Sequence, residues 1–282
     1  MEKVILLPNI TKDKNLAFTK NIASRLINLG LTVYSDEKYV MEGVIGYTTP
    51  PSDAELIIVV GGDGSVIDAT CIAVELDIPL LGINLGKVGY LTTLDPDNLD
   101  ELSGLLTDNY FISEKMLLSA SIIQKDGNVY QCKRLALNDV IITRDSYLGI
   151  ADFKIENARG DSVIYRADGV ILSTPSGSTA YSLSAGGPVI SHTLDSIMVM
   201  PICPHSFFNR AIIYGPEEKI KITNLSDTLL NISVDGRLFD SIARDECCEI
   251  KKSDRRIKML TFSESNLFAT LSKKIKLLHE SV

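Results

Sequence analysis

The residues best suited to chemistry lie in a glycine-rich turn with one carboxylate, Gly61-Gly62-Asp63-Gly64-Ser65. An apolar run at 55–60 precedes it, and apolar residues at helical spacing follow it up to Leu76, which predicts strand, turn and helix. Glycines admit positive φ and expose backbone N–H groups, and a helix N-terminus favours phosphate. The turn therefore predicts either a phosphate-facing loop or merely a tight connection. It lacks the Gly-Lys-Ser/Thr of a P-loop, and Ile67 stands where the dinucleotide fingerprint has a third small residue.

A second stretch, 173–188, is rich in serine, threonine and glycine. That composition would also fit a flexible linker, but apolar residues flank the stretch directly. Ser176 or Ser178 is a candidate N-cap of a short helix. Hydroxyl groups at such a helix start would offer hydrogen-bond donors to a nucleotide, and Tyr181 could stack or hydrogen-bond. We interpret the stretch as a binding segment.

Polar pairs elsewhere allow two interpretations each. Asn138-Asp139, between apolar runs, is typical of a turn, although both side chains could bind ribose hydroxyls. Arg166 and Asp168 lie two positions apart and would share one face of a strand, either toward a cleft or toward solvent. His205 is one of 3 histidines without metal-ligand spacing, so a structural zinc is not expected. Asp235-Gly236 favours a plain hairpin turn.

Composition sets the broad class. The chain has 282 residues, of which 45% are hydrophobic, enough for a sizeable core and for two domains. A net charge of -8 excludes nonspecific binding to nucleic acid. The 5 cysteines form no disulfide framework, which predicts reduced thiols in a cytoplasmic protein. The sequence predicts neither a signal peptide nor a membrane span.

The order of elements predicts an α/β doubly wound domain over 1–112 and an antiparallel β-sandwich-like domain over 113–255. In the first domain we expect strands at 4–7, 31–34, 55–60 and 78–83, helices at 16–29, 66–76 and 96–106, and mostly loop at 35–54. In the second we expect many short strands separated by turns. The tail 256–282 is predicted to begin with a strand, to continue as a helix, and to pack back on the first domain.

Taken together, these stretches resemble the NAD kinase family over most of the chain. Gly61-Gly62-Asp63-Gly64 is similar to its GGDG motif, which other kinases share. Thr174 to Pro188 is similar to its longest and most specific block. The elements that complete the ordered series are Gly89-Tyr90-Leu91, Asn138-Asp139, Arg166 to Asp168, Pro204-His205-Ser206 and Asp235-Gly236.

The resemblance implies phosphorylation of the 2′-hydroxyl on the adenosine ribose of NAD, which gives NADP. Asp63 would be the general base. The residues implied to bind NAD or the donor phosphates are Gly62, Gly64, Tyr90, Asn138, Asp139, Arg166, Asp168, Ser176, Thr179, Ala180, Tyr181, Ser184 and His205. Mg²⁺ would be held mainly by the donor phosphates, without a metal site made by the protein. The donor would be ATP or polyphosphate, and the assembly a homotetramer or homodimer.

Some positions depart from the family pattern. Asp139 replaces the usual Glu, and Tyr90 replaces the usual Phe. Asp68 stands where many members carry Lys or Arg, which leaves Lys87 or Arg237 as candidates for holding phosphate. The sequence leaves open the phosphoryl donor, the use of NADH and feedback by NADP.

Two other functions remain open from the sequence. A lipid kinase would share only the GGDG motif, but it would want an apolar or basic membrane patch, and the acidic chain has no charge block. A dinucleotide-binding regulator without catalysis is the third possibility, and Asp63 argues against it only weakly.

Overall fold

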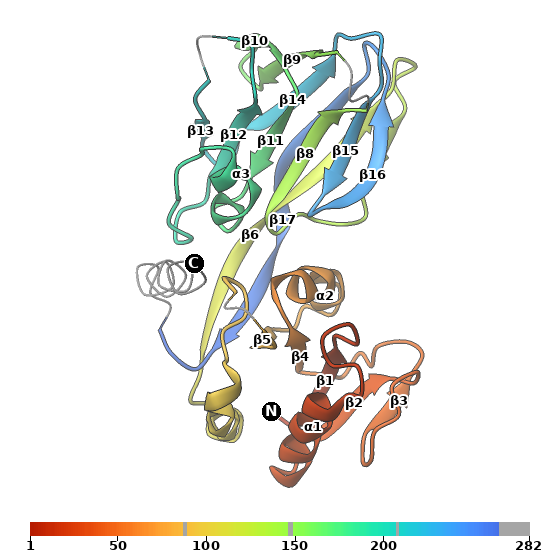
Figure 1. Ribbon diagram of the computed structural model, residues 1–282, viewed down its shortest axis with the longest axis vertical. Coiled ribbons are helices and arrows are strands. Elements are labelled where there is room, and N and C mark those ends of the chain that lie inside the picture. Colours follow the sequence, from red (N-terminus) through yellow and green to blue (C-terminus); the bar gives the residue numbers. More distant parts are fainter. Residues whose placement is uncertain (87–88, 146–148, 207–208, 265–282) are drawn as a thin grey trace. The chain divides into compact units, whose positions relative to one another are not determined.

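The computed structural model of the chain describes residues 1–86, 89–145, 149–206 and 209–264 (Figure 1). These residues form two compact units. Unit 1 comprises Met1–Glu114 together with the described residues from Ile257 to Glu264, and unit 2 comprises Lys115–Arg256. Outside the described residues lie the four positions of the predicted C-terminal helical face, Leu267, Leu271, Ile275 and Leu278.

A parallel sheet forms the centre of unit 1. Its strands are β1 (Lys3–Pro8), β2 (Thr32–Asp36), β3 (Ile45–Tyr47), β4 (Leu56–Gly61) and β5 (Leu80–Asn84). The strand order is β5-β4-β1-β2-β3, and each neighbouring pair is parallel. The end of β17 (Cys247–Thr261) adds to the β5 edge in parallel, with Met259 opposite Leu80. The short strand β3 lies in the segment that was predicted to be loop. The sequence did not reveal it because its largely exposed residues carry no hydrophobic pattern.

Helices connect these strands across both faces of the sheet. Helix α1 (Ala17–Asn28) joins β1 to β2, α2 (Asp63–Leu76) joins β4 to β5, and the 3-10 helix η1 (Pro96–Leu106) follows β5. The strand order reverses between β1 and β4, so right-handed crossovers place α1 and α2 on opposite faces. The doubly wound α/β fold is confirmed. Among the described residues, no helix is long and apolar enough to cross a membrane.

The core of unit 1 lies between the sheet, α1 and η1. Its buried members include Val4, Leu6, Ile22, Leu26, Ile58, Val60, Leu99, Leu102, Leu105 and Leu260. Every residue of β4 and β5 is buried, as expected for strands covered on both faces. The loops that leave the carboxyl ends of β4 and β5 therefore start from fully buried strands.

Unit 2 is a sandwich of two antiparallel sheets. One sheet has the order β13-β12-β11-β8-β15-β16. Its strands are β8 (Asp139–Arg144), β11 (Gly169–Ser173), β12 (Ile197–Ile202), β13 (Ile212–Tyr214), β15 (Leu230–Val234) and β16 (Arg237–Ile242). The other sheet of this unit contains β6 (Phe111–Ile123), β7 (Val129–Gln131), β9 (Ala151–Asn157), β10 (Ser162–Ala167), β14 (Lys219–Asn224) and the first part of β17.

Side chains from both sheets of unit 2 meet in one core. Phe153, Ile220 and Cys248 come from one sheet, and Ile142 and Leu172 come from the other. The sandwich-like architecture predicted for this part of the chain is confirmed. Strand β16, whose residues are mostly exposed, was not predicted, and neither was β9, although its buried apolar and partly exposed polar residues alternate as in a half-buried strand.

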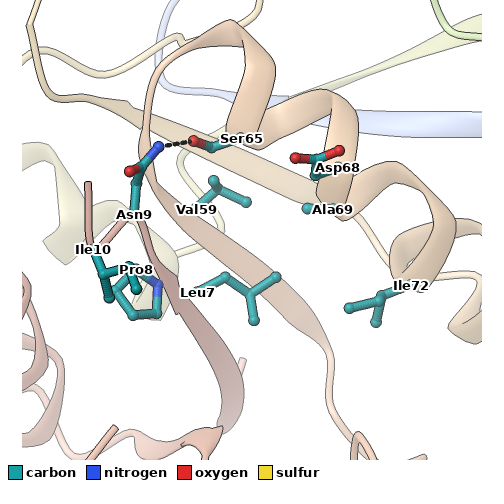
Figure 2. A pocket seen from close by; sticks show the side chains of 9 residues that line it. All are labelled: Leu7, Pro8, Asn9, Ile10, Val59, Ser65, Asp68, Ala69 and Ile72. Atoms are coloured by element: carbon teal, nitrogen blue, oxygen red, sulfur yellow. Dashed lines mark hydrogen bonds between the residues drawn. The ribbon is translucent and has the colours of Figure 1, made fainter. Parts of the chain in front are cut away.

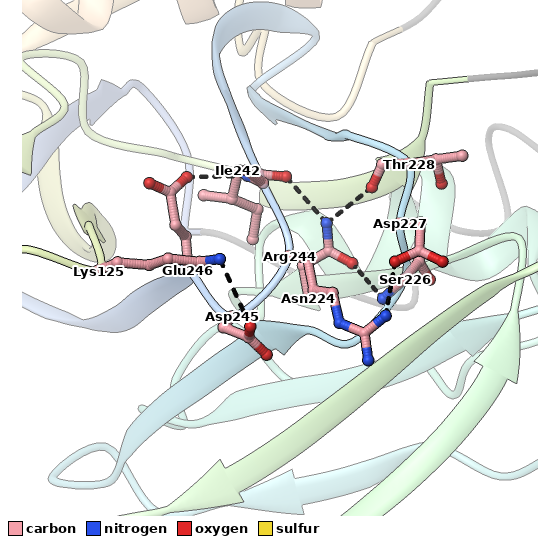
Figure 3. A network of polar contacts seen from close by, with 10 residues as sticks. Lys125, Asn224, Ser226, Asp227, Thr228, Ile242, Arg244, Asp245 and Glu246 are labelled. Carbon is pink, nitrogen blue, oxygen red and sulfur yellow. Dashed lines mark hydrogen bonds and ion pairs between the residues drawn. The ribbon is translucent and has the colours of Figure 1, made fainter.

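A buried amide holds the turn that follows β14 (Figure 3). Asn224 Nδ2 donates to the carbonyl oxygens of Thr228 at 2.8 Å and Ile242 at 3.0 Å, and its Oδ1 accepts the N–H of Ser226 at 2.8 Å. Exposed ion pairs surround this amide, and pairs of that kind contribute little to stability. The network is a purely structural way to hold a turn in unit 2.

Candidate functional site

Asp63 stands at the carboxyl end of β4, as the first residue of α2. Its Oδ2 accepts the N–H of Tyr90 at 2.8 Å. Its Oδ1 accepts the N–H of Leu91 at 2.9 Å and the N–H of Thr92 at 3.4 Å. Three consecutive backbone groups of the loop after β5 therefore fix the direction of this half-buried carboxylate. The structure brings Gly62, Asp63, Gly64 and Tyr90 together.

Gly89 allows that loop to approach Asp63. A Cβ atom on Gly89 would lie 2.0 Å from Asp63 Oδ1 and 2.6 Å from Thr92 Oγ1, so any larger residue here would displace these two side chains. The hydroxyl of Tyr90 is partly buried in the same cluster. Burial raises its pKa, and the negative charge of Asp63 raises it further. Glycine at this position thus allows the Asp63 carboxylate to keep the direction that its three N–H bonds set.

A cation that the sequence analysis missed, Lys12, lies over the glycine turn. A Cβ atom on Gly62 would lie 2.7 Å from Lys12 Nζ, and one on Gly86 would lie 3.5 Å from it. Lys12 follows β1, and the carboxyl ends of β1 and β4 flank the point where the strand order reverses. Loops at that point bind ligands in open α/β sheets, and this rule could have drawn attention to Lys12.

A cavity of about 320 Å³ lies beside the same turn (Figure 2). Apolar side chains of Leu7, Val59 and Ile72 line it, and Asn9 and Ser65 stand at one edge, where Asn9 Nδ2 donates to Ser65 Oγ at 2.7 Å. The cavity therefore joins an apolar floor to a polar edge at the start of α2.

Lys87 and Arg237 are the two cations first considered for holding phosphate. Lys87 lies outside the described residues, and Arg237 begins β16 in unit 2. Asp68 lines the cavity near Ser65, so this position offers a carboxylate rather than a cation. Among the described residues, no three His, Cys, Asp or Glu side chains are grouped as metal ligands.

In unit 2, Asn138 and Asp139 form a turn that Asp235 holds. Asp235 Oδ2 accepts the N–H of Leu137 at 2.8 Å, and its Oδ1 accepts the N–H groups of Asn138 at 2.8 Å and Asp139 at 3.0 Å. Asp139 is only 4% exposed. Burial raises the pKa of its carboxyl to about 7, with a contribution from the charge of Asp235. The hairpin interpretation of Asp235-Gly236 was incomplete, because the side chain acts on another turn.

The serine- and threonine-rich segment is ordered, and its hydroxyl groups divide into two sets. Thr174, Ser178 and Ser182 are buried. Ser178 Oγ donates to the carbonyl of Pro175 at 2.7 Å and accepts the N–H of Ile190 at 3.0 Å. Ser182 Oγ donates to the carbonyl of Gly177 at 3.0 Å. These buried hydroxyls hold the segment in place, because Ser182 bonds within it, Ser178 ties it to Ile190, and Thr174 Oγ1 donates to the carbonyl of Leu137.

Of the two serines predicted as N-caps, Ser176 stands at the N-cap position of a short turn and Ser178 does not cap a helix. Ser176 precedes a 3-10 turn, Gly177–Thr179, without a side-chain capping bond. The four-residue helix α3 (Tyr181–Ser184) then begins after Ala180, again without a side-chain cap. Tight packing explains the difference, because a Cβ on Gly177 would lie 2.0 Å from the carbonyl oxygen of Asn138. The second set of side chains stays accessible to solvent: Ser176, Thr179, Ala180, Tyr181 and Ser184.

Arg166 and Asp168 do not form the predicted same-face pair. Arg166 is the second-last residue of β10. Asp168 is the single residue between β10, in one sheet, and β11, in the other. Arg166 instead pairs with Asp152 at 3.0 Å, and this partner raises its pKa. Asp168 Oδ1 accepts a bond from Arg144 Nε at 2.8 Å. His205 is exposed, and its backbone N–H donates to the backbone carbonyl of Arg166 at 2.8 Å.

Two family models match the chain. One is described as the ATP-NAD kinase N-terminal domain and covers residues 4–110. The other is described as the ATP-NAD kinase C-terminal domain and covers residues 137–262.

Similar proteins extend over nearly the full length. An NAD kinase of Caldanaerobacter subterraneus subsp. tengcongensis is 34% identical and covers 98% of this chain and 99% of its own. An NAD kinase of Lachnoclostridium phytofermentans is 35% identical, with 97% and 99% covered. The crystal structure of an NAD kinase from Archaeoglobus fulgidus in complex with ATP is 25% identical, with a TM-score of 0.74 over 96% of this chain and 99% of that one. Yeast NADH kinase complexed with NADH shares the fold with a TM-score of 0.82 at 21% identity, over 96% of this chain and 86% of that one.

Proposed function

Because the chain belongs to the NAD kinase family, we propose that it transfers a phosphoryl group to the 2′-hydroxyl of the adenosine ribose of NAD and so produces NADP. The observation that carries this function is the match of both family models, over 4–110 and 137–262, to one continuous chain. The enzyme is a phosphotransferase with an alcohol acceptor. A lipid kinase or a silent regulator is not favoured by relatives that are named NAD kinases over nearly their full length.

Asp63 is the proposed general base. It accepts the proton of the 2′-hydroxyl while the ribose oxygen forms a bond to the terminal phosphorus of the donor and the bridging P–O bond breaks. The three N–H bonds from Tyr90, Leu91 and Thr92 support this role, because they aim the carboxylate without neutralising it. Phosphoryl transfer needs positioning and charge neutralisation more than covalent chemistry from the protein.

The donor phosphates are proposed to lie on the backbone N–H groups around Gly62 and Gly64, at the N-terminus of α2. The ammonium of Lys12 supports this placement, because it lies over the same turn in an acidic chain. A bound Mg²⁺ would neutralise charge on the donor oxygens. That ion would be held mainly by the donor phosphates and by waters, which leaves the Asp63 carboxylate available as the base.

NAD is proposed to bind to unit 2. Asn138 and Asp139 would bind ribose hydroxyls, and Asp168, whose Oδ1 accepts a bond from Arg144, would bind the nicotinamide carboxamide. The accessible set of the 173–188 segment would bind the adenine and its ribose: Ser176, Thr179, Ala180, Tyr181 and Ser184. Tyr90, Arg166 and His205 remain proposed binding residues. The five residues named for the adenine and its ribose are all at least partly exposed to solvent, which supports their role in binding.

Three wider features belong to the same proposal. The donor is ATP or polyphosphate, and the protein is a homotetramer or homodimer. A cytoplasmic location is supported by the cysteines, all of which are free thiols.

The test is direct. The full chain is incubated with NAD, ATP and Mg²⁺, and the product is analysed by ³¹P NMR for a phosphate monoester on the 2′-oxygen. We expect NADP to form. Phosphorylation of a diacylglycerol or sphingosine instead, or tight NAD binding without NADP from any donor, would replace this function with one of its two alternatives.

A further inference from the structure

Asp235 is bonded to a single turn through four hydrogen bonds. Its two carboxylate oxygens accept the N–H groups of Leu137, Asn138 and Asp139 at 2.8, 2.8 and 3.0 Å. Its own N–H donates to the carbonyl of Asp139 at 3.0 Å. Asp235 adopts a φ of 49°, a conformation that aspartate tolerates better than most residues. One side chain therefore satisfies three consecutive donors of a turn that is about 96 to 98 residues away in sequence.

The opposite side of the same turn is held by the serine- and threonine-rich segment. Thr174 Oγ1 donates to the carbonyl of Leu137 at 2.5 Å, and the N–H of Thr174 donates to the carbonyl of Asn138 at 2.9 Å. Gly177 packs against the backbone of Asn138 so closely that it leaves no room for a Cβ. All six backbone polar groups of 137–139 thus have partners that do not involve the side chains of Asn138 or Asp139.

We propose that Asp235 is a positioning residue for the nucleotide substrate, because it holds the 137–139 backbone in the conformation that presents Asn138 and Asp139 to the ribose. This inference rests on the proposed function, in which those two side chains bind NAD. Asp235 touches the turn and not the ligand, so it acts through its neighbours. The requirement is for an acceptor-only side chain, since all three partners are donors.

The charge of Asp235 adds a second, measurable link to Asp139. The pKa of the Asp139 carboxyl is about 7, raised by burial and then by Asp235. Burial also raises the pKa of Asp235, against the lowering effects of its three N–H bonds and of Arg134. Ionised Asp139 is the stronger acceptor for ribose hydroxyls, so NAD affinity should rise as pH increases through about 7. Removal of the Asp235 charge should move that transition to lower pH.

The test uses Asp235→Asn in the full chain, with NAD binding measured by titration calorimetry between pH 5.5 and 8.5. Asparagine keeps one acceptor oxygen but turns an amide N–H₂ toward a backbone N–H. We expect NAD affinity to fall about tenfold at pH 8, with kcat changed by less than about threefold. Wild-type affinity should be about tenfold weaker at pH 6 than at pH 8, and the variant should show a smaller ratio.

Asn224→Ala is the matched structural control, because Asn224 also holds a turn of unit 2 with three hydrogen bonds. It should lower the melting temperature and leave both NAD affinity and its pH midpoint unchanged. Asp235→Glu is the second variant if asparagine does not fold. It keeps the charge, so the pH midpoint should stay, while the added methylene displaces the turn and weakens NAD binding.

The outcomes separate this inference from the function on which it rests. If Asp235→Asn binds NAD as tightly as the wild type does, with the same pH midpoint, the positioning role is overturned and the proposed NAD phosphorylation is unaffected. If Asp235→Asn does not fold, wild-type NAD affinity in Asp235→Glu would do the same. If the wild-type protein binds no NAD by calorimetry, the function and the inference both fail, and that result is independent of turnover.

Discussion

Asp63 in unit 1 and Asp235 in unit 2 use the same hydrogen-bond geometry. Each belongs to an Asp-Gly pair, and each accepts the N–H groups of three consecutive residues from another loop. Their surroundings differ. Asp63 begins a long helix beside Lys12, whereas Asp235 lies against a second carboxylate, Asp139. The comparison teaches that three N–H bonds can orient a carboxylate for its own chemistry or can make it a support for neighbouring side chains.

Asn224 shows a third use of the same principle. It holds its turn with bonds to Ser226, Thr228 and Ile242, and none of these is a proposed ligand residue (Figure 3). The three sites therefore form a series from proposed chemistry, through positioning, to structure alone. Experiments that separate turnover, affinity and stability can test this order.

The largest expected effect is that of Asp63→Asn. Loss of a general base typically lowers turnover by about 10²-fold or more, and we expect that loss in kcat. NAD affinity, measured by calorimetry, should be largely kept, in contrast to Asp235→Asn. Wild-type turnover in the Asp63 variant would remove this residue from the mechanism and end the distinction between the two carboxylates.

Two glycines sharpen the comparison next. Gly89→Ala places a Cβ against the Asp63 carboxylate, and Gly177→Ala places one against the Asn138 carbonyl, each at 2.0 Å before relaxation. We expect the first to lower kcat and the second to weaken NAD affinity, each by about tenfold or more, because overpacking shifts the groups it meets. Steady-state kinetics at saturating ATP measures both.

Gly215→Ala is the control for both glycine variants, since no atom lies within 4 Å of its added Cβ. It should behave as the wild type. A kcat defect in Gly177→Ala with unchanged NAD affinity would contradict the division of roles.

Lys12→Met should weaken binding of the phosphoryl donor and leave binding of NAD unchanged. Bonds from a cation to phosphate contribute about 1.5–3 kcal/mol, so we expect the KM for ATP to rise about tenfold. NAD affinity should not change. Lys14→Met, an exposed lysine of the same loop, is the matched control. An unchanged KM for ATP in Lys12→Met would show that its ammonium does not contact the donor.

The smallest expected effect concerns the stability of unit 2. The pKa of Asp139 is about 7 in the folded chain and ordinarily 3.8, so the folded state binds more protons between these pH values. The free energy of unfolding should therefore fall as pH rises from about 4 to about 7, and stay level above 7. Asp139→Asn should weaken this trend, to which Asp235 also contributes, and should be the more stable protein at pH 8 by about 1 kcal/mol or more.

Urea unfolding at pH 5 and pH 8 measures that difference. Asp227→Asn serves as the control because the Asp227 side chain is 88% exposed. An identical pH trend in wild type and Asp139→Asn would mean that Asp139 does not titrate in this range.

Sequence patterns predicted the elements that carry strong hydrophobic periodicity. The fully buried β4 and β5 were predicted, and so was the glycine turn between β4 and α2. The exposed strands β3 and β16 were not, because pairing with a neighbour and not their own burial makes them strands. The same limit applies to the predicted Arg166–Asp168 pair, because the sheet switch at Asp168 depends on where β10 and β11 find partners.

The sequence by itself determined the family, the doubly wound and sandwich architecture, and the candidate carboxylate Asp63. These depend on local residue types and on their order along the chain. Only the tertiary structure showed the partners: Lys12 over Gly62, Arg144 on Asp168, and Asp235 on the 137–139 turn. A hydrogen bond or an ion pair is decided by distance in space, and residues such as Asp235 and Asn138, 97 positions apart in sequence, leave no mark of that distance in a linear pattern.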